Sequence, residues 1–134
     1  MKPTNKIMIS ISHKHSEFIY SGEQHFVILK STPKVAPYIV YMYETKQNGG
    51  AGAVVGCFHS QMKLKTNVPE TPQGEEYLKY LAERACISLE ELKNYANGRE
   101  ICAIQICQAT RYPASLPLSH FGFSRPPQSW RYLE

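Results

Sequence analysis

The chain has 134 residues, of which 43% are hydrophobic, and it carries a formal net charge of +4. This length fits one domain over residues 1–134, and the hydrophobic content can fill a core, which excludes a disordered tail and a disulfide-dependent miniprotein. The mild positive charge permits contacts with phosphate backbones but is far below that of a histone-like polycation.

The first half of the chain has the pattern of strands around one short helix. Alternating isoleucines at residues 7–11 predict a half-buried strand. A helix is expected over residues 13–21, with Gly22 as its C-terminal stop. Further strands are expected at residues 24–30, 38–44 and 53–64.

The second half begins with two expected helices and ends in strands. Thr71 precedes a proline and suits a helix start, and the apolar residues after it repeat with helical spacing. Ser88 and Glu91 form a capping box for the next helix, which an Asn-Gly pair at residues 97–98 ends. Strands are expected at residues 100–112, which are apolar on both faces, and at residues 129–133.

This order of elements predicts the fold class. Strands and helices do not alternate regularly, which argues against a doubly wound parallel sheet. A strand that is apolar on both faces needs cover on both sides. We therefore predict an α+β domain, a small mixed β-barrel of five to six strands with the helices packed outside. The first strand and residues 100–112 are expected in the same sheet system.

The N-terminus and the cysteines indicate a cytoplasmic protein without a cofactor. Residues 1–15 contain no apolar run long enough for a signal peptide or a membrane span. The cysteines form no C-x-x-C pair, and we expect them to be reduced and buried, with no metal site. They are Cys57, Cys86, Cys102 and Cys107.

Three segments resemble bacterial ASCH-domain proteins of the PUA-like superfamily. They are ISISHKHSEFIYSGEQHF at residues 9–26, ISLEELKNYANGREICAIQI at residues 87–106 and FSRPPQSWRYL at residues 123–133. The resemblance implies a barrel of five or six strands with a cleft, and an association with RNA. Some proteins of this kind deacetylate a modified cytidine, and some cut RNA.

The chain departs from the family's signature, G-x-K-x-x-E-x-R. Gly22 matches, but Gln24, Val27 and Leu29 stand where the lysine, the glutamate and the arginine are expected. An amide neither carries a charge nor exchanges a proton near neutral pH, so Gln24 cannot act as a lysine does. We therefore expect the lysine-glutamate hydrolase activity to be absent.

The C-terminal segment is the first candidate ligand site. A double proline at residues 126–127 stiffens the loop between Arg125 and Gln128. Gln128 could bond a base edge, Arg125 a phosphate, and Trp130 could stack on a base. The alternative is that Trp130 closes the end of the barrel.

Five further residues are candidates for the cleft. They are Lys14, at a strand-to-helix junction that favours anions, Gln24, Lys30, Tyr43 and Glu44. Tyr43 could belong to a base-stacking wall or pack in the core. Glu44 could bond a ligand amine, pair with Lys30, or be a surface carboxylate. His13 and His15, two residues apart without nearby carboxylates, are weak metal ligands.

These features together predict a non-catalytic or weakly catalytic binding module for RNA or a modified nucleotide, seated in the barrel cleft. One alternative is a hydrolase, of amidohydrolase or ribonuclease type, acting on a modified nucleoside or on RNA with a relocated active site. The other is a regulatory domain that binds a protein partner and has a vestigial cleft.

Overall fold

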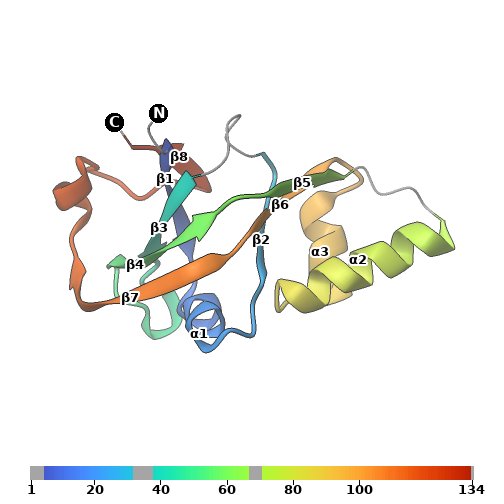
Figure 1. Cartoon of the computed structure of the whole chain (residues 1–134), viewed down its shortest axis with the longest axis horizontal. Coiled ribbons are helices and arrows are strands. Elements are labelled where there is room, and N and C mark those ends of the chain that lie inside the picture. Colours follow the sequence, from blue (N-terminus) through green and yellow to red (C-terminus); the bar gives the residue numbers. More distant parts are fainter. Residues whose placement is uncertain (1–4, 32–37, 67–70, 134) are drawn as a thin grey trace.

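The computed structural model describes residues 5–31, 38–66 and 71–133, and there it contains two β-sheets and three α-helices. The larger sheet has the strand order β7-β4-β3-β1-β8 and the smaller one β2-β6-β5 (Figure 1). The strands of the larger sheet are β1 (Asn5–Ile11), β3 (Tyr38–Glu44), β4 (Ala53–Ser60), β7 (Cys107–Leu116) and β8 (Trp130–Tyr132). The smaller sheet contains β2 (Phe26–Leu29), β5 (Lys63–Thr66) and β6 (Ile101–Gln105).

The three helices are α1 (His13–Ser21), α2 (Pro72–Arg84) and α3 (Leu89–Ala96), and short 3₁₀ helices occupy Gln47–Gly49 and Leu118–Phe121. The mixed α+β class is confirmed. Eight strands are present in the described ranges, more than the five to six that we predicted, because two expected strands each divide in two.

Strand β1 is buried on both faces, not on one as its alternation suggested. It runs parallel to β3 on one side and antiparallel to β8 on the other. Ile7 and Ile9 point into the core between the sheets, and Met8, on the opposite face, packs with Tyr43 and Val54. A central strand covered on both faces carries apolar side chains on both of them, and Met8 supplies one on the second face.

Both divided strands pass from one sheet to the other. Residues 53–64 separate into β4 and the start of β5, and residues 100–112 into β6 and the first part of β7. The two crossing points lie together, since the backbone N–H of Gln105 donates to the carbonyl oxygen of Met62 at 3.0 Å. Ile106, between β6 and β7, donates likewise to His25 at 2.9 Å. Each expected strand is divided because its backbone changes hydrogen-bonding partners where it passes from one sheet to the other.

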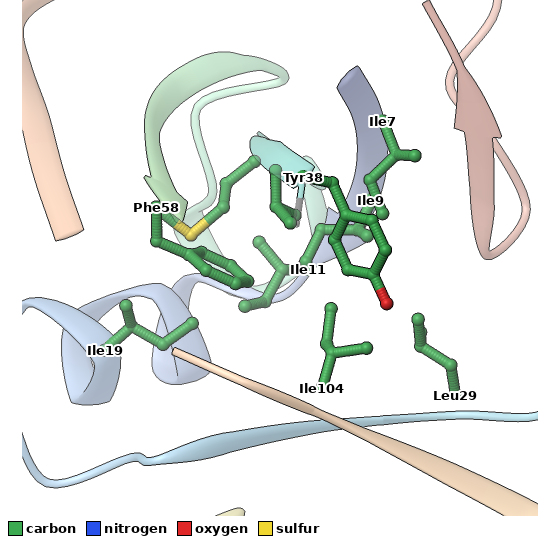
Figure 2. Close-up of a cluster of buried hydrophobic side chains, with 10 residues drawn as sticks. Ile7, Ile9, Ile11, Ile19, Leu29, Tyr38, Phe58 and Ile104 are labelled. Atoms are coloured by element: carbon green, nitrogen blue, oxygen red, sulfur yellow. The ribbon is translucent and has the colours of Figure 1, made fainter. Parts of the chain in front are cut away.

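The main core lies between the two sheets and α1. Ile11 of β1, Phe58 of β4 and Ile19 of α1 meet Leu29 of β2 and Ile104 of β6 in one cluster (Figure 2). Leu29, at the arginine position of the ASCH signature, is 5% exposed and belongs to this cluster. The apolar replacement therefore fills core space and leaves no charge buried there.

Helices α2 and α3 cover the other face of the smaller sheet. Leu81 and Leu92 pack with Ile101 and Ala103 of β6, whereas Ile104 faces the main core. The N-cap prediction for α3 is confirmed, because the Ser88 hydroxyl accepts the backbone N–H of Glu91 at 3.0 Å.

Helix α1 connects the end of β1 to the segment that leads into β2. The side chain of Ser12 caps its N-terminus by accepting the backbone N–H of His15 at 3.3 Å. Gly22 ends it with a φ of 84°, a left-handed conformation that favours glycine. Both ends lie where the sequence predicted them, and Gln24 follows two residues after the stop.

Candidate ligand-binding site

A pocket of about 440 Å³ lies between the end of β1, the start of α1, strand β2 and helix α3, and we call it the α1–α3 pocket. Apolar side chains form most of its wall, and polar side chains from β1, α1 and α3 reach into it. Its lining consists of Ser10, Ile11, Ser12, His15, Gln24, Val27, Ile28, Ala85, Ile87, Glu91, Asn94 and Tyr95.

Gln24 is the buried polar side chain of this pocket, with 5% of its surface exposed. Its amide Nε2 donates to the carbonyl oxygen of Phe26 at 3.0 Å, and its Oε1 lies 2.8 Å from Nδ1 of His15. The ring of His15 also meets the edge of the Phe18 ring, with centroids 6.0 Å apart. Gln24 and His15 are therefore held as a pair on one wall.

The pocket contains two of the positions at which the ASCH signature is changed. Gln24, in place of the lysine, and Val27, in place of the glutamate, both line it. Among the described residues, the ionisable side chains of its lining are His15, Glu91 and Tyr95, and no lysine or arginine belongs to it. The described lining of the pocket thus combines polar and apolar side chains and includes no permanently positive group.

Tyr95 connects the pocket to Lys30 and to the C-terminal segment. The Nζ of Lys30 lies 5.2 Å from the centroid of the Tyr95 ring. Burial raises the pKa of Tyr95, and hydrogen bonds with the Lys30 backbone and the Ser129 side chain partly offset that rise. Ser10, on the β1 side, donates to the carbonyl oxygen of Pro127. Both walls of the pocket therefore touch the tail.

A second, open groove of about 530 Å³ runs along that tail, and we call it the tail groove. Arg125 and Gln128 are exposed in it, whereas Pro127 is buried. Trp130 is half-buried and packs against the main core, and its Nε1 donates to the carbonyl oxygen of Ser31 at 2.9 Å. The groove is lined by Ser31, Arg125, Pro126, Pro127, Gln128, Ser129, Trp130 and Arg131.

Trp130 combines packing with groove lining, so its removal should lower stability. We expect Trp130→Ala to cost about 2 kcal/mol, less than a fully buried tryptophan because part of the ring is exposed. Trp130→Phe, which keeps a ring but loses the bond to Ser31, should cost about 1 kcal/mol. Thermal melts of the two variants measure this difference, and an unchanged melting temperature for Trp130→Ala would rule out the packing role.

Glu44 lies on the opposite side of α1, beside a smaller pocket of about 190 Å³. It is 4% exposed and accepts hydrogen bonds from Ser16 Oγ at 2.6 Å and from the backbone N–H of Ala51 at 3.0 Å. His13 Nδ1 lies 3.1 Å from its Oε1. Burial alone would raise the pKa of Glu44, but these hydrogen bonds outweigh it and hold that pKa below its ordinary value.

The expected pairing of Glu44 with Lys30 is therefore wrong, and so is the alternative of a surface carboxylate, because Glu44 is buried beside α1. That Glu44 bonds a ligand stays a prediction. The Glu44 oxygens already hold α1 and the turn after β3, and the Lys30 ammonium lies over Tyr95 instead. Glu44 points to the α1 side because it shares the strand parity of the core residue Met42.

Tyr43 and Lys14 also lie away from the α1–α3 pocket. Tyr43 is 6% exposed and packs with Met8 and Val54, so the core alternative describes it and the base-stacking wall does not. Lys14 is exposed on α1, and its charge reaches Cys86 in the turn between α2 and α3. Of the eight candidate residues, the α1–α3 pocket contains Gln24, the smaller pocket beside α1 contains Glu44, and Lys30 lies over the Tyr95 ring. The tail groove contains Arg125, Gln128 and Trp130.

The polar residues that α3 and β1 bring to the pocket carry no signal of a site in the sequence. Asn94 and Tyr95 fall on a helix whose other face is core, and Ser10 on a strand whose neighbours are buried. His15 was considered only as a metal ligand. It turns to Gln24 whereas His13 turns to Glu44, and the part of the chain that the structure describes contains no group of three or more metal-binding side chains.

None of the helices in the described ranges is long and apolar enough to cross a membrane.

Comparison with known proteins identifies the fold. Neither a protein-family model nor a curated protein matches the chain. Solved structures do match. The crystal structure of ASCH from Zymomonas mobilis is similar at 18% identity with a TM-score of 0.76, over 96% of this chain and 87% of that one. A serine-to-alanine variant matches at 17% identity with a TM-score of 0.78, over 96% and 88% of the two chains. The chain therefore has the fold of an ASCH-domain protein.

Proposed function

We propose that this chain is a cytoplasmic nucleic-acid-binding domain that holds one nucleotide of RNA, or a modified nucleotide, in the α1–α3 pocket. In this proposal residues 1–134 form a single unit whose two sheets make up a PUA-like barrel. The observation that carries it is a pocket in which Gln24 is buried and hydrogen-bonded among apolar walls, with the Lys30 ammonium over the ring of the lining residue Tyr95.

The pocket suits a nucleobase better than a phosphate. A base is flat and uncharged, and it is recognised by stacking on apolar surface and by hydrogen bonds to its edges. Val27 and Ile28 supply apolar wall, and His15 and Asn94 supply polar groups. The absence of a lysine or arginine from the described lining removes the usual phosphate ligand from the interior.

The phosphates and a neighbouring base would then lie outside, along the tail groove. Lys30 lies over the ring of Tyr95, which lines the pocket, and Arg125 is exposed beside Gln128 in the groove. Lys14 offers a further exposed cation near the end of α2. With a net charge of +4, the chain supports only a few phosphate contacts, so affinity should be moderate and sensitive to salt.

Titration of a labelled, short single-stranded RNA against tail variants tests this function. Arg125→Ala and Gln128→Ala should each weaken binding by about five- to tenfold, because a side chain next to a rigid double proline is lost without relaxing the loop. Only Arg125→Ala should also reduce the dependence of affinity on salt, by about one phosphate contact.

Lys79→Ala, which removes an exposed cation of α2, is the matched control and should bind as the parent does. If both tail variants match the parent as well, the tail is structural. An affinity that salt does not change would point to a neutral small ligand or to a protein partner.

A further inference from the structure

The hydrogen bonds of Gln24 determine which way its amide points. The carbonyl oxygen of Phe26 can only accept, so the Gln24 atom 3.0 Å from it is the amide nitrogen. The amide oxygen therefore faces His15, 2.8 Å from Nδ1. An amide oxygen cannot donate, and so the proton of this contact belongs to Nδ1 of His15.

The proton on Nδ1 leaves Nε2 of a neutral His15 with a free lone pair. A neutral imidazole has one N–H group, and its other nitrogen is an acceptor. Within the described residues Nε2 has no hydrogen-bond partner, and the side chain lines the α1–α3 pocket. The cap at Ser12 and the edge contact with Phe18 hold the residue and its ring in place.

The charges around His15 oppose an anion at that position. Helix α3 contributes Glu91 and Tyr95 to the lining, whereas the lining residues of β1 and β2 are uncharged. Lys14, the neighbour of His15 on α1, and Lys30, whose Nζ lies over the Tyr95 ring, are exposed and do not belong to the pocket lining. An anion in the pocket would therefore be repelled by the lone pair on Nε2 of His15 and by the Glu91 carboxylate. The oxygen of a ligand carbonyl group would be repelled by the same lone pair.

We propose that His15 is a fixed hydrogen-bond acceptor, so that the pocket selects an uncharged group with an N–H or O–H donor, such as the amino or imino edge of a nucleobase, and excludes phosphate. This inference rests on the proposed function and names the part of the nucleotide that enters. Gln24 acts as a positioning residue, since it sets the tautomer of His15 without itself offering the acceptor.

A ligand-free measurement tests the tautomer directly. A long-range ¹H–¹⁵N correlation spectrum at about pH 7.5 should show the His15 ring in the Nδ1–H form, with the signal assigned by its loss in His15→Phe. Gln24→Leu removes the acceptor facing Nδ1 and should populate the Nε2–H form as well, with the fold checked by thermal melting. A parent protein in the Nε2–H form overturns the inference.

Binding of nucleosides, which lack phosphate, tests the selection. Adenosine, cytidine, guanosine and uridine are titrated by calorimetry at about pH 7.5. The preferred nucleoside should bind about tenfold more weakly to His15→Phe, which keeps a ring against Phe18. Glu90→Gln, which changes an exposed residue of α3 outside the lining, is the control and should bind as the parent does.

The two proposals fail in different ways. Nucleoside binding that His15→Phe leaves unchanged overturns the acceptor role while the nucleotide function stands. A parent protein in the Nδ1–H form that binds none of the nucleosides overturns the nucleotide function while the direction of the hydrogen bond stands.

Discussion

Replacing Glu44 by alanine is expected to lower the free energy of unfolding by about 2–4 kcal/mol. Its buried carboxylate accepts from Ser16, from the Ala51 backbone and from His13, and so ties α1 to the end of β3 and the turn after it. The loss should stay below the sum of three charged hydrogen bonds. Ser16 can still donate to the carbonyl oxygen of His13, and Ala51 is exposed to water.

Chemical denaturation measures this effect, with Glu17→Ala as the matched control on the same helix. Glu17 pairs with Arg111 at 2.8 Å, but both side chains are about half exposed, so its loss should cost less than about 1 kcal/mol. Equal losses for the two variants would mean that the Glu44 hydrogen bonds do not stabilise the fold.

The pH dependence of the free energy of unfolding should also show the contribution of the Glu44 carboxylate. The pKa of Glu44 is lowered from 4.5 in the folded chain, so its contribution is present above that value and is lost as the pH falls through the lower, folded pKa. Below about pH 4.5, stability should therefore fall less steeply in Glu44→Ala than in the parent. Parallel slopes for the two proteins would show that another carboxyl group causes the acid transition.

Filling the α1–α3 pocket is expected to give the largest loss of binding. Asn94 is exposed on α3 and lines the pocket, so Asn94→Trp can place an indole in the 440 Å³ space without disturbing the core. Nucleotide affinity should drop by about a hundredfold or more, because the ligand would have to displace the ring from an apolar wall. Melting temperature should change little.

Glu90→Trp provides the control for Asn94→Trp. Glu90 is also exposed on α3 but does not line the pocket, so the same bulky residue should leave affinity within about twofold of the parent. RNA binding that survives Asn94→Trp would move the site from the α1–α3 pocket to the tail groove.

The elements that local chemistry specifies were predictable from the sequence. Gly22 ends α1 because glycine readily takes the left-handed conformation, and Ser88 begins α3 because its hydroxyl accepts a backbone N–H three residues on. Each of these signals involves residues within one helical turn. The segment 125–128 lies outside the helices and strands, as its double proline predicts.

Only the tertiary structure decided how the strands divide and which side chains meet. The segments 53–64 and 100–112 cross between sheets because each sheet pairs with a different part of them, and composition along a strand does not encode its partner. Gln24 meets His15 because α1 folds the chain back between them, and Asn94 joins them from α3. The helix ends followed from the local sequence because they depend on backbone preferences within one turn, whereas the burial of both faces of β1 did not. Packing of the two sheets determined the pocket, because contacts between distant residues form only when the apolar faces are buried together.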